Sequence, residues 1–138
     1  MPQKAPKKDQ QFTRIDPSQT ADSKKLIEVI GQGLLEKQAE DITVLDVHDL
    51  TTLTDAFVVC HAATDVQVKA IADSVIVTTK KQLDEGPWKH EGRDTRRWVI
   101  LDYVNVVVHI FKKELREHYA LERIWSDAKI SKIEDVKP

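Results

Sequence analysis

The sequence of 138 residues is poor in several residue types, and each scarcity excludes a class of protein. Its single cysteine, Cys60, cannot form an internal disulfide, which excludes a disulfide-rich secreted scaffold and predicts a reducing compartment. No apolar run approaches the ~20 residues that a membrane-spanning helix needs. The N-terminus has lysines but lacks the apolar segment of a secretory signal. We therefore expect a cytoplasmic protein.

The remaining composition is that of one globular domain, with 41% hydrophobic and 32% charged residues. Residues 1–14 carry Lys4, Lys7, Lys8 and Arg14 against Asp9, a net charge of +3, which leaves −5 for the rest of a chain whose total is −2. A body with that charge is a poor ligand for nucleic acid and is better suited to a basic protein. The basic tail, rich in lysine, glutamine and proline, is expected to be disordered.

Hydrophobic periodicity predicts an α/β domain in which a mixed β-sheet is covered by helices. We expect a disordered basic tail over 1–19, the domain over 20–126 and a polar C-terminal extension over 127–138. The predicted elements are a helix from about 20 to 37, strands at 42–47 and 57–62, a helix at 64–83, a short strand at 88–91, strands at 98–103 and 104–111, and a helix at 113–125. Thr64 and Gln67 fit a capping box, with the threonine capping the second helix and the glutamine reaching back.

The apolar strands between residues 98 and 111 organise the chain. Side chains alternate in an extended segment, so Trp98, Ile100 and Asp102 share one face while the residues between them, with Tyr103, share the other. Strands that are apolar on both faces need cover on both sides. An aspartate and a tryptophan on one such face call for a functional explanation.

Four aspartates in or beside strands, Asp41, Asp46, Asp55 and Asp102, are candidates for a Mg²⁺ site or an acid–base pair. Strand-end aspartates also accept hydrogen bonds from backbone N–H groups in turns. The structural role is favoured because no glycine-rich phosphate-binding loop accompanies them. Cys60, inside an apolar run, is likewise favoured as a small buried side chain over a catalytic thiol.

Two histidine-containing sites are weighed in the same way. Glu114, His118 and Glu122 follow at intervals of four and could form a metal-binding row, although any solvated helix face gives this spacing. His109, helped by Asp102, could be a general base. No serine or cysteine nucleophile has a motif around it, so a hydrogen-bonded structural histidine is favoured.

Large aromatic residues are concentrated in the C-terminal half as Trp88, Trp98, Tyr103 and Trp125. Aromatic side chains surrounded by charge are typical interface anchors, with core packing as the alternative. Packing is favoured for Trp125 at a helix end. Trp98 is the better candidate anchor, because it begins a strand directly after a charged loop.

These segments together resemble the signature of the ribosomal silencing factor (RsfS, Iojap) family, over about residues 23–126. The match consists of WVILDY at 98–103, VVVHIF at 106–111, Arg116, YALE at 119–122, Trp125 and, upstream in the same order, residues 44–47, 54–59, 66–73 and 91–92.

The resemblance implies a nucleotidyltransferase-like topology without a transferase motif, in a protein that is not an enzyme and uses no metal or cofactor. Such proteins bind the fourteenth protein of the large ribosomal subunit on the face where the small subunit docks, and so block subunit joining and lower translation when nutrients are scarce. On this chain we expect the contact at Trp98, Asp102 and Tyr103, with Asp46, Glu91 and Asp55 as acidic or orienting neighbours.

Other functions stay open at this point. One alternative is a nucleotide- or metal-dependent enzyme that uses Asp46, Asp102 and His109. Another is an RNA-binding module that acts through the basic tail. The two-sided apolar strands also leave room for a homodimer.

The chain departs from the family pattern at three places. Val104-Asn105 replaces the usual Gly-Asp of a tight hairpin, Ala56 replaces a tyrosine or similar residue, and residues 61–63 (His-Ala-Ala) replace Ser/Thr-Gly. Asparagine tolerates a left-handed conformation and valine does not, so the sequence leaves the turn type open.

Overall fold

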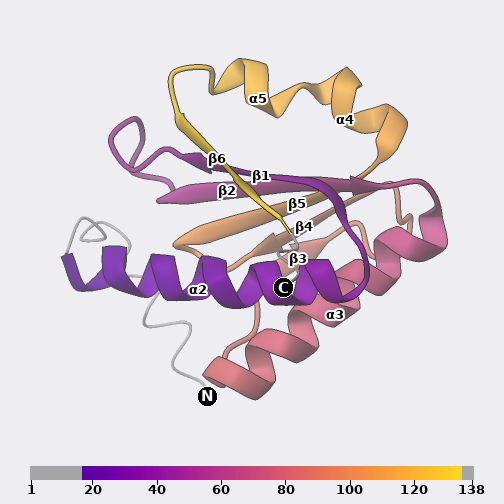
Figure 1. The fold of residues 1–138 in the computed structure, drawn as a ribbon, viewed down its shortest axis with the longest axis horizontal. Helices are drawn as coiled ribbons and strands as arrows, with labels where there is room; N and C mark the ends of the chain where they lie inside the picture. Colours follow the sequence, from indigo (N-terminus) through magenta and orange to yellow (C-terminus); the bar gives the residue numbers. More distant parts are fainter. Residues whose placement is uncertain (1–16, 135–138) are drawn as a thin grey trace.

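The computed structural model describes residues 17–134, which form a six-stranded β-sheet with helices on both faces (Figure 1). The elements are α2 (Pro17–Glu36), β1 (Glu40–Asp46), β2 (Ala56–Ala62), α3 (Asp65–Leu83), β3 (Lys89–Glu91), β4 (Trp98–Asp102), β5 (Val106–Lys112), α4 (Lys113–Tyr119), α5 (Leu121–Ile124) and β6 (Lys129–Ile133). Within the described part of the chain, no helix is both long enough and apolar enough to span a membrane.

The sheet is mixed, with strand order β3-β4-β5-β2-β1-β6. β2 and β5 pair in parallel, and every other neighbouring pair is antiparallel. A parallel pair needs a long crossover, which α3, β3 and β4 supply here. The predicted fold class, a mixed sheet covered by helices, is confirmed.

Helix α3 begins and ends as its sequence predicts, with one difference. The Thr64 hydroxyl accepts a hydrogen bond from the Gln67 backbone N–H at 3.1 Å, as expected of a capping threonine. The Gln67 side chain does not reach back to this cap; its amide donates to the Lys37 and Gln38 carbonyls after α2. Asp84 ends α3 in the left-handed conformation.

Helices α2 and α3 pack together against one face of the sheet (Figure 1). A Cβ atom at Gly33 would lie 2.9 Å from the Val75 Cα, so only glycine permits this approach of the helices. The larger core lies here, between these helices and the inward side chains of β1, β2, β4 and β5.

The C-terminal part differs from the prediction in two ways. The single helix expected over 113–125 is broken at Ala120, whose φ of 49° lies in the left-handed region, so α4 and α5 are separate. The segment 129–133, expected in a polar extension, is the edge strand β6 and pairs antiparallel with β1. At the other end, α2 starts at Pro17, and the predicted tail before it lies outside the described residues.

In the hairpin between β4 and β5, the left-handed conformation falls on the less suitable of the two central residues. Val104, not Asn105, takes the positive φ, at 76°. The Asp102 side chain accepts from the Val104 backbone N–H at 2.8 Å, and Tyr103 N–H donates to the Val106 carbonyl at 2.9 Å. A β-branched residue is strained in this conformation.

Candidate partner-binding surface

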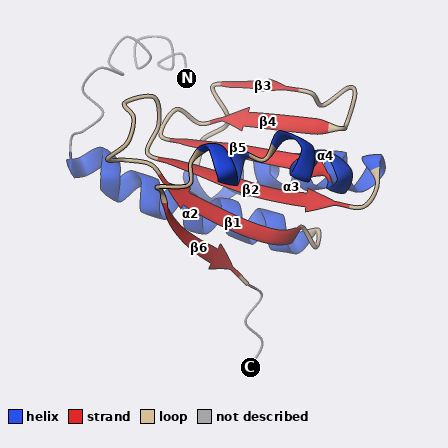
Figure 2. Cartoon of the chain, turned by 90° about the horizontal axis from the view of Figure 1, so that it is seen from above, coloured by secondary structure: helices blue, strands red, loops and turns tan. Residues whose placement is uncertain are grey.

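The sheet face turned away from α2 and α3 is covered only in part. Figure 2 shows α4 and α5 crossing this side and leaving β3 and most of β4 beside them. Strand registers place Trp98, Ile100 and Asp102 of β4 on this face, beside Val107 and His109 of β5. We call the part of this sheet face around β3, β4 and β5, on which these five side chains lie, the open face. The predicted alternation along β4 is confirmed, because its residues are half-buried on this face and fully buried between.

Trp98 is the largest side chain of the open face and is held by three neighbours. Its indole Nε1–H donates to the Nδ1 atom of His109 at 3.0 Å. Its ring centroid lies 4.8 Å from that of Phe111 and 4.3 Å from that of Tyr119 in α4. Trp98 is half-buried and Tyr119 is 42% exposed, so the pair forms an aromatic surface with a fixed orientation.

His109 is buried beneath Trp98, with 7% of its surface exposed. Burial lowers its pKa from 6.5 to about 4, so the imidazole is neutral near pH 7. Across the strands it lies opposite Ile100, while Asp102 lies opposite Val107. Asp102 does not serve as the predicted helper of a general base, because its Oδ1 accepts from the Val104 backbone.

Two of the six predicted contact residues lie inside the molecule, which corrects their expected placement at an interface. Tyr103 is 7% exposed on the helix side, where its hydroxyl lies 2.9 Å from the Thr79 Oγ1, and burial raises its pKa to about 12. Asp55 is 6% exposed and accepts a 2.6 Å hydrogen bond from Ser23 in α2. Both residues join the sheet to its helices.

The other four predicted contact residues are accessible, but they form one group of three and one separate residue. Glu91 in β3 is exposed and pairs with Ile100, which places it beside Trp98 and Asp102 on the open face. Asp46 is exposed at the end of β1, several strands away in the sheet order, where it accepts from the His48 backbone N–H. Sequence reasoning did not select Ile100 or Tyr119, whose exposure only the packing of α4 reveals.

The four candidate aspartates do not converge on one site. Asp46 and Asp102 accept from backbone N–H groups, as the structural interpretation predicts. Asp55 binds a serine, and Asp41 forms a 2.6 Å ion pair with Lys132, whose hydrogen bond lowers the pKa of Asp41. Among the side chains that the structure describes, no group of three acidic, histidine or cysteine residues is placed to hold a metal ion.

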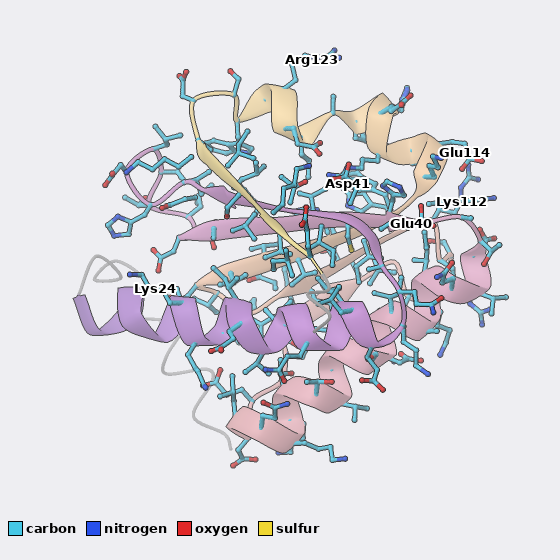
Figure 3. All side chains as sticks on the ribbon, in the orientation of Figure 1. Lys24, Glu40, Asp41, Lys112, Glu114 and Arg123 are labelled. Atoms are coloured by element: carbon cyan, nitrogen blue, oxygen red, sulfur yellow. The ribbon has the colours of Figure 1, made fainter. Side chains whose placement is uncertain are left out.

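The candidate metal-binding row on the last helix, Glu114, His118 and Glu122, is not formed either. Glu122 lies beyond the break at Ala120 and accepts from the Arg116 Nε at 2.9 Å. Glu114 and Arg123 instead lie on the outer side of α4 and α5, away from the sheet (Figure 3). The predicted packing role of Trp125 is confirmed, because its ring lies 5.5 Å from that of Phe57 in the smaller core under α5.

Arg116 joins the α4–α5 elbow to the sheet and was not selected from the sequence as a structural residue. Its guanidinium is 8% exposed and donates to Glu122, to the Thr43 hydroxyl at 3.0 Å and to the Asp41 carbonyl at 2.6 Å. Burial and the neighbouring guanidinium lower the pKa of His61. These contacts fix α4, and through it Tyr119, above Trp98.

Comparison with known proteins agrees with these features. Residues 20–138 match the model of the family described as ribosomal silencing factor during starvation. The chain is 38% identical over 114 residues to ribosomal silencing factor RsfS of Bacillus subtilis, and this alignment covers 80% of this chain and 93% of that protein. It is 33% identical over 101 residues to the chloroplastic protein Iojap of Zea mays, covering 72% of this chain and 42% of that one.

A solved structure gives the same result for the fold. The crystal structure of a Chromobacterium violaceum protein superposes with a TM-score of 0.72 at 29% sequence identity, covering 81% of this chain and 92% of that one. The family match spans nearly the whole described domain, β6 included. The chain therefore belongs to the family of ribosomal silencing factors.

Proposed function

We propose that this protein represses translation by docking on the large ribosomal subunit and keeping the small subunit from joining it. The observation that carries the proposal is the aromatic pair of Trp98 and Tyr119, held in one orientation on the sheet face that also presents the acidic groups of Asp102 and Glu91. Partly exposed, fixed aromatic side chains are the usual anchors of protein interfaces. Membership of the ribosomal silencing factor family supports a ribosomal partner.

The proposed partner is the fourteenth protein of the large subunit, a basic protein on the face where the small subunit docks. A chain whose residues 15–138 carry −5 suits such a partner, because opposite charges speed encounter and suppress wrong partners. The open face contributes Asp102 and Glu91 to this field, although Lys89 lies 3.9 Å from Glu91 and offsets part of it. Asp46 lies too far along the sheet to share a small contact with Trp98, and we assign it a peripheral role.

The mechanism is steric exclusion and requires no bond to be made or broken. Two partners cannot occupy one surface, so the fraction of large subunits blocked equals the fraction to which this protein is bound. Affinity for the free large subunit therefore determines the degree of repression.

Co-sedimentation with separated ribosomal subunits tests the proposal. The parent protein is expected with free large subunits and not with assembled ribosomes. Trp98→Ala should weaken binding by about 2 kcal/mol or more, roughly 30-fold, with an unchanged circular dichroism spectrum. Val77→Ala, at a 54% exposed position on the far side of α3, is the matched control and should bind as the parent does. Equal binding by Trp98→Ala and the parent would show that the open face is not the contact.

Two further expectations stay predictions. The basic residues 1–14 lie outside the described part of the chain; contact with ribosomal RNA through them would appear as a steep salt dependence that disappears when they are deleted. A homodimer would appear as a concentration-dependent mass in sedimentation of the free protein.

A further inference from the structure

The hydrogen bond between Trp98 and His109 determines the tautomer of the imidazole and the orientation of the indole. An indole nitrogen is only a donor, so the His109 Nδ1 at 3.0 Å must accept and carries no proton. The proton of the neutral imidazole therefore sits on Nε2. This nitrogen is buried and has no hydrogen-bond partner in the part of the chain that the structure describes.

In this tautomer the hydrogen bond with Trp98 is the one side-chain hydrogen bond described for the His109 ring. A proton on Nδ1 would set two donors against each other and release the indole. Leaving the buried Nε2–H unpaired costs free energy, and the hydrogen bond that Nδ1 accepts from Trp98 offsets part of this cost. The rings of Phe57 and Phe111, 5.5 and 6.2 Å from that of His109, hold the imidazole in place from β2 and β5.

The position of this contact in the sheet explains why it matters for docking. His109 lies in β5 at the centre of the sheet, and Trp98 lies in β4 on the partly covered side. Without an acceptor below it, a half-buried indole has other rotamers to sample. Fixing one rotamer before binding removes an entropic cost of association.

We propose that His109 is a positioning residue for docking: its Nδ1 holds the Trp98 indole in the orientation that the partner recognises. This inference rests on the proposed function, and it adds a residue that does not itself touch the partner.

Three substitutions in the full-length protein separate this role from simple packing. His109→Phe keeps a ring in the core and removes the acceptor. His109→Asn keeps an acceptor, since its side-chain oxygen takes the place of Nδ1. Trp98→Phe removes the donor and keeps an aromatic ring on the open face.

The first measurement is the indole N–H resonance of Trp98 in a ¹H–¹⁵N spectrum, assigned by its loss in Trp98→Phe. In the parent protein this proton should be protected from exchange with solvent. In His109→Phe it should shift and lose protection, and in His109→Asn much of the protection should return.

The second measurement is affinity for purified large ribosomal subunits. His109→Phe should bind about three- to tenfold more weakly than the parent, the effect of one lost hydrogen bond. His109→Asn should recover most of that loss. In a Trp98→Phe background, His109→Phe should have no further effect, because the donor is already absent.

The outcomes distinguish the two proposals. If the parent does not bind large subunits, the proposed function is wrong and this inference falls with it. If the parent binds and His109→Phe binds as tightly, or weakens binding equally in the Trp98→Phe background, only the inference is wrong. A protected Trp98 resonance in His109→Phe would also overturn it, since the indole would then be held by something else.

Discussion

Acidification should destabilise this protein well above the pH at which its carboxylates titrate, and His109 should account for much of the effect. Its pKa is lowered by burial from 6.5 to about 4 in the folded protein. Between these values the unfolded chain binds a proton that the folded chain does not. Stability is therefore fully present above pH 6.5 and is lost as the pH falls through about 4. Protonated His109 can no longer accept from Trp98, which adds to the effect.

The size of the loss follows from the two pKa values. A folded pKa of about 4 against 6.5 in the unfolded chain corresponds to about 3 kcal/mol when both states are protonated. Between pH 7 and pH 5 about 2 kcal/mol of this should disappear. Asp41 and Asp73, whose pKa values are lowered below 3.8 by neighbouring cations, stay ionised over that window. The stability that these two ionised carboxylates contribute would be lost only at lower pH.

Urea unfolding at pH 7, 6 and 5 measures this contribution, with His109→Phe as the comparison. The parent should lose about 2 kcal/mol more than the variant between pH 7 and pH 5. His61, whose pKa is also lowered, is present in both proteins and cancels in the comparison. Equal losses in the two proteins would refute the argument that burial lowers the pKa of His109 in the folded protein and so destabilises it on acidification.

Three further substitutions should change stability by amounts that thermal and urea unfolding can measure. Gly33→Ala should destabilise by about 1–3 kcal/mol, because the new methyl group meets the Val75 backbone. Arg116→Met should cost about 3 kcal/mol, because it leaves Glu122 half-buried without its cation. Val104→Gly should stabilise by about 1 kcal/mol, because glycine takes the φ of 76° without strain.

Each of these has an outcome that would contradict it. Gly31→Ala is the control for the first, since its methyl group would meet only the side chain of Ile133 and should be tolerated better than one at Gly33. Arg123→Met controls the second at an exposed position and should be nearly neutral. A destabilised Val104→Gly protein would show that the valine side chain contributes more by packing than its backbone loses by strain.

The sequence predicts those parts of the fold whose signals are local. Alternation gives the two faces of β4, and the threonine before α3 gives its start. Strand β6 was missed because an exposed edge strand with lysines carries no hydrophobic pattern. The break at Ala120 was missed because neither glycine nor proline marks it.

The site was predicted less well, because its geometry depends on contacts between distant segments. Alternation puts Tyr103 with Val99 and Leu101 on the helix side, and the structure agrees. Its place among the predicted contacts came from the aromatic inventory and the family resemblance, neither of which distinguishes the two faces of the sheet. The burial of Asp55 depends on a serine 32 residues away, for which the sequence has no signal. Trp98 was identified correctly as partly exposed, but its hydrogen bond to His109 requires the β4–β5 register.

The place of β6 in the sheet has a consequence for how the chain is made. Strand β1 is synthesised early, yet one of its two neighbours, β6, is nearly the last described segment of the chain. During synthesis, β1 therefore has an unpaired edge until residues 129–133 have left the exit tunnel, and its open N–H and C=O groups can pair with another strand. Among the described strands, β1 thus gains its second neighbour only after every other strand of the sheet has been made.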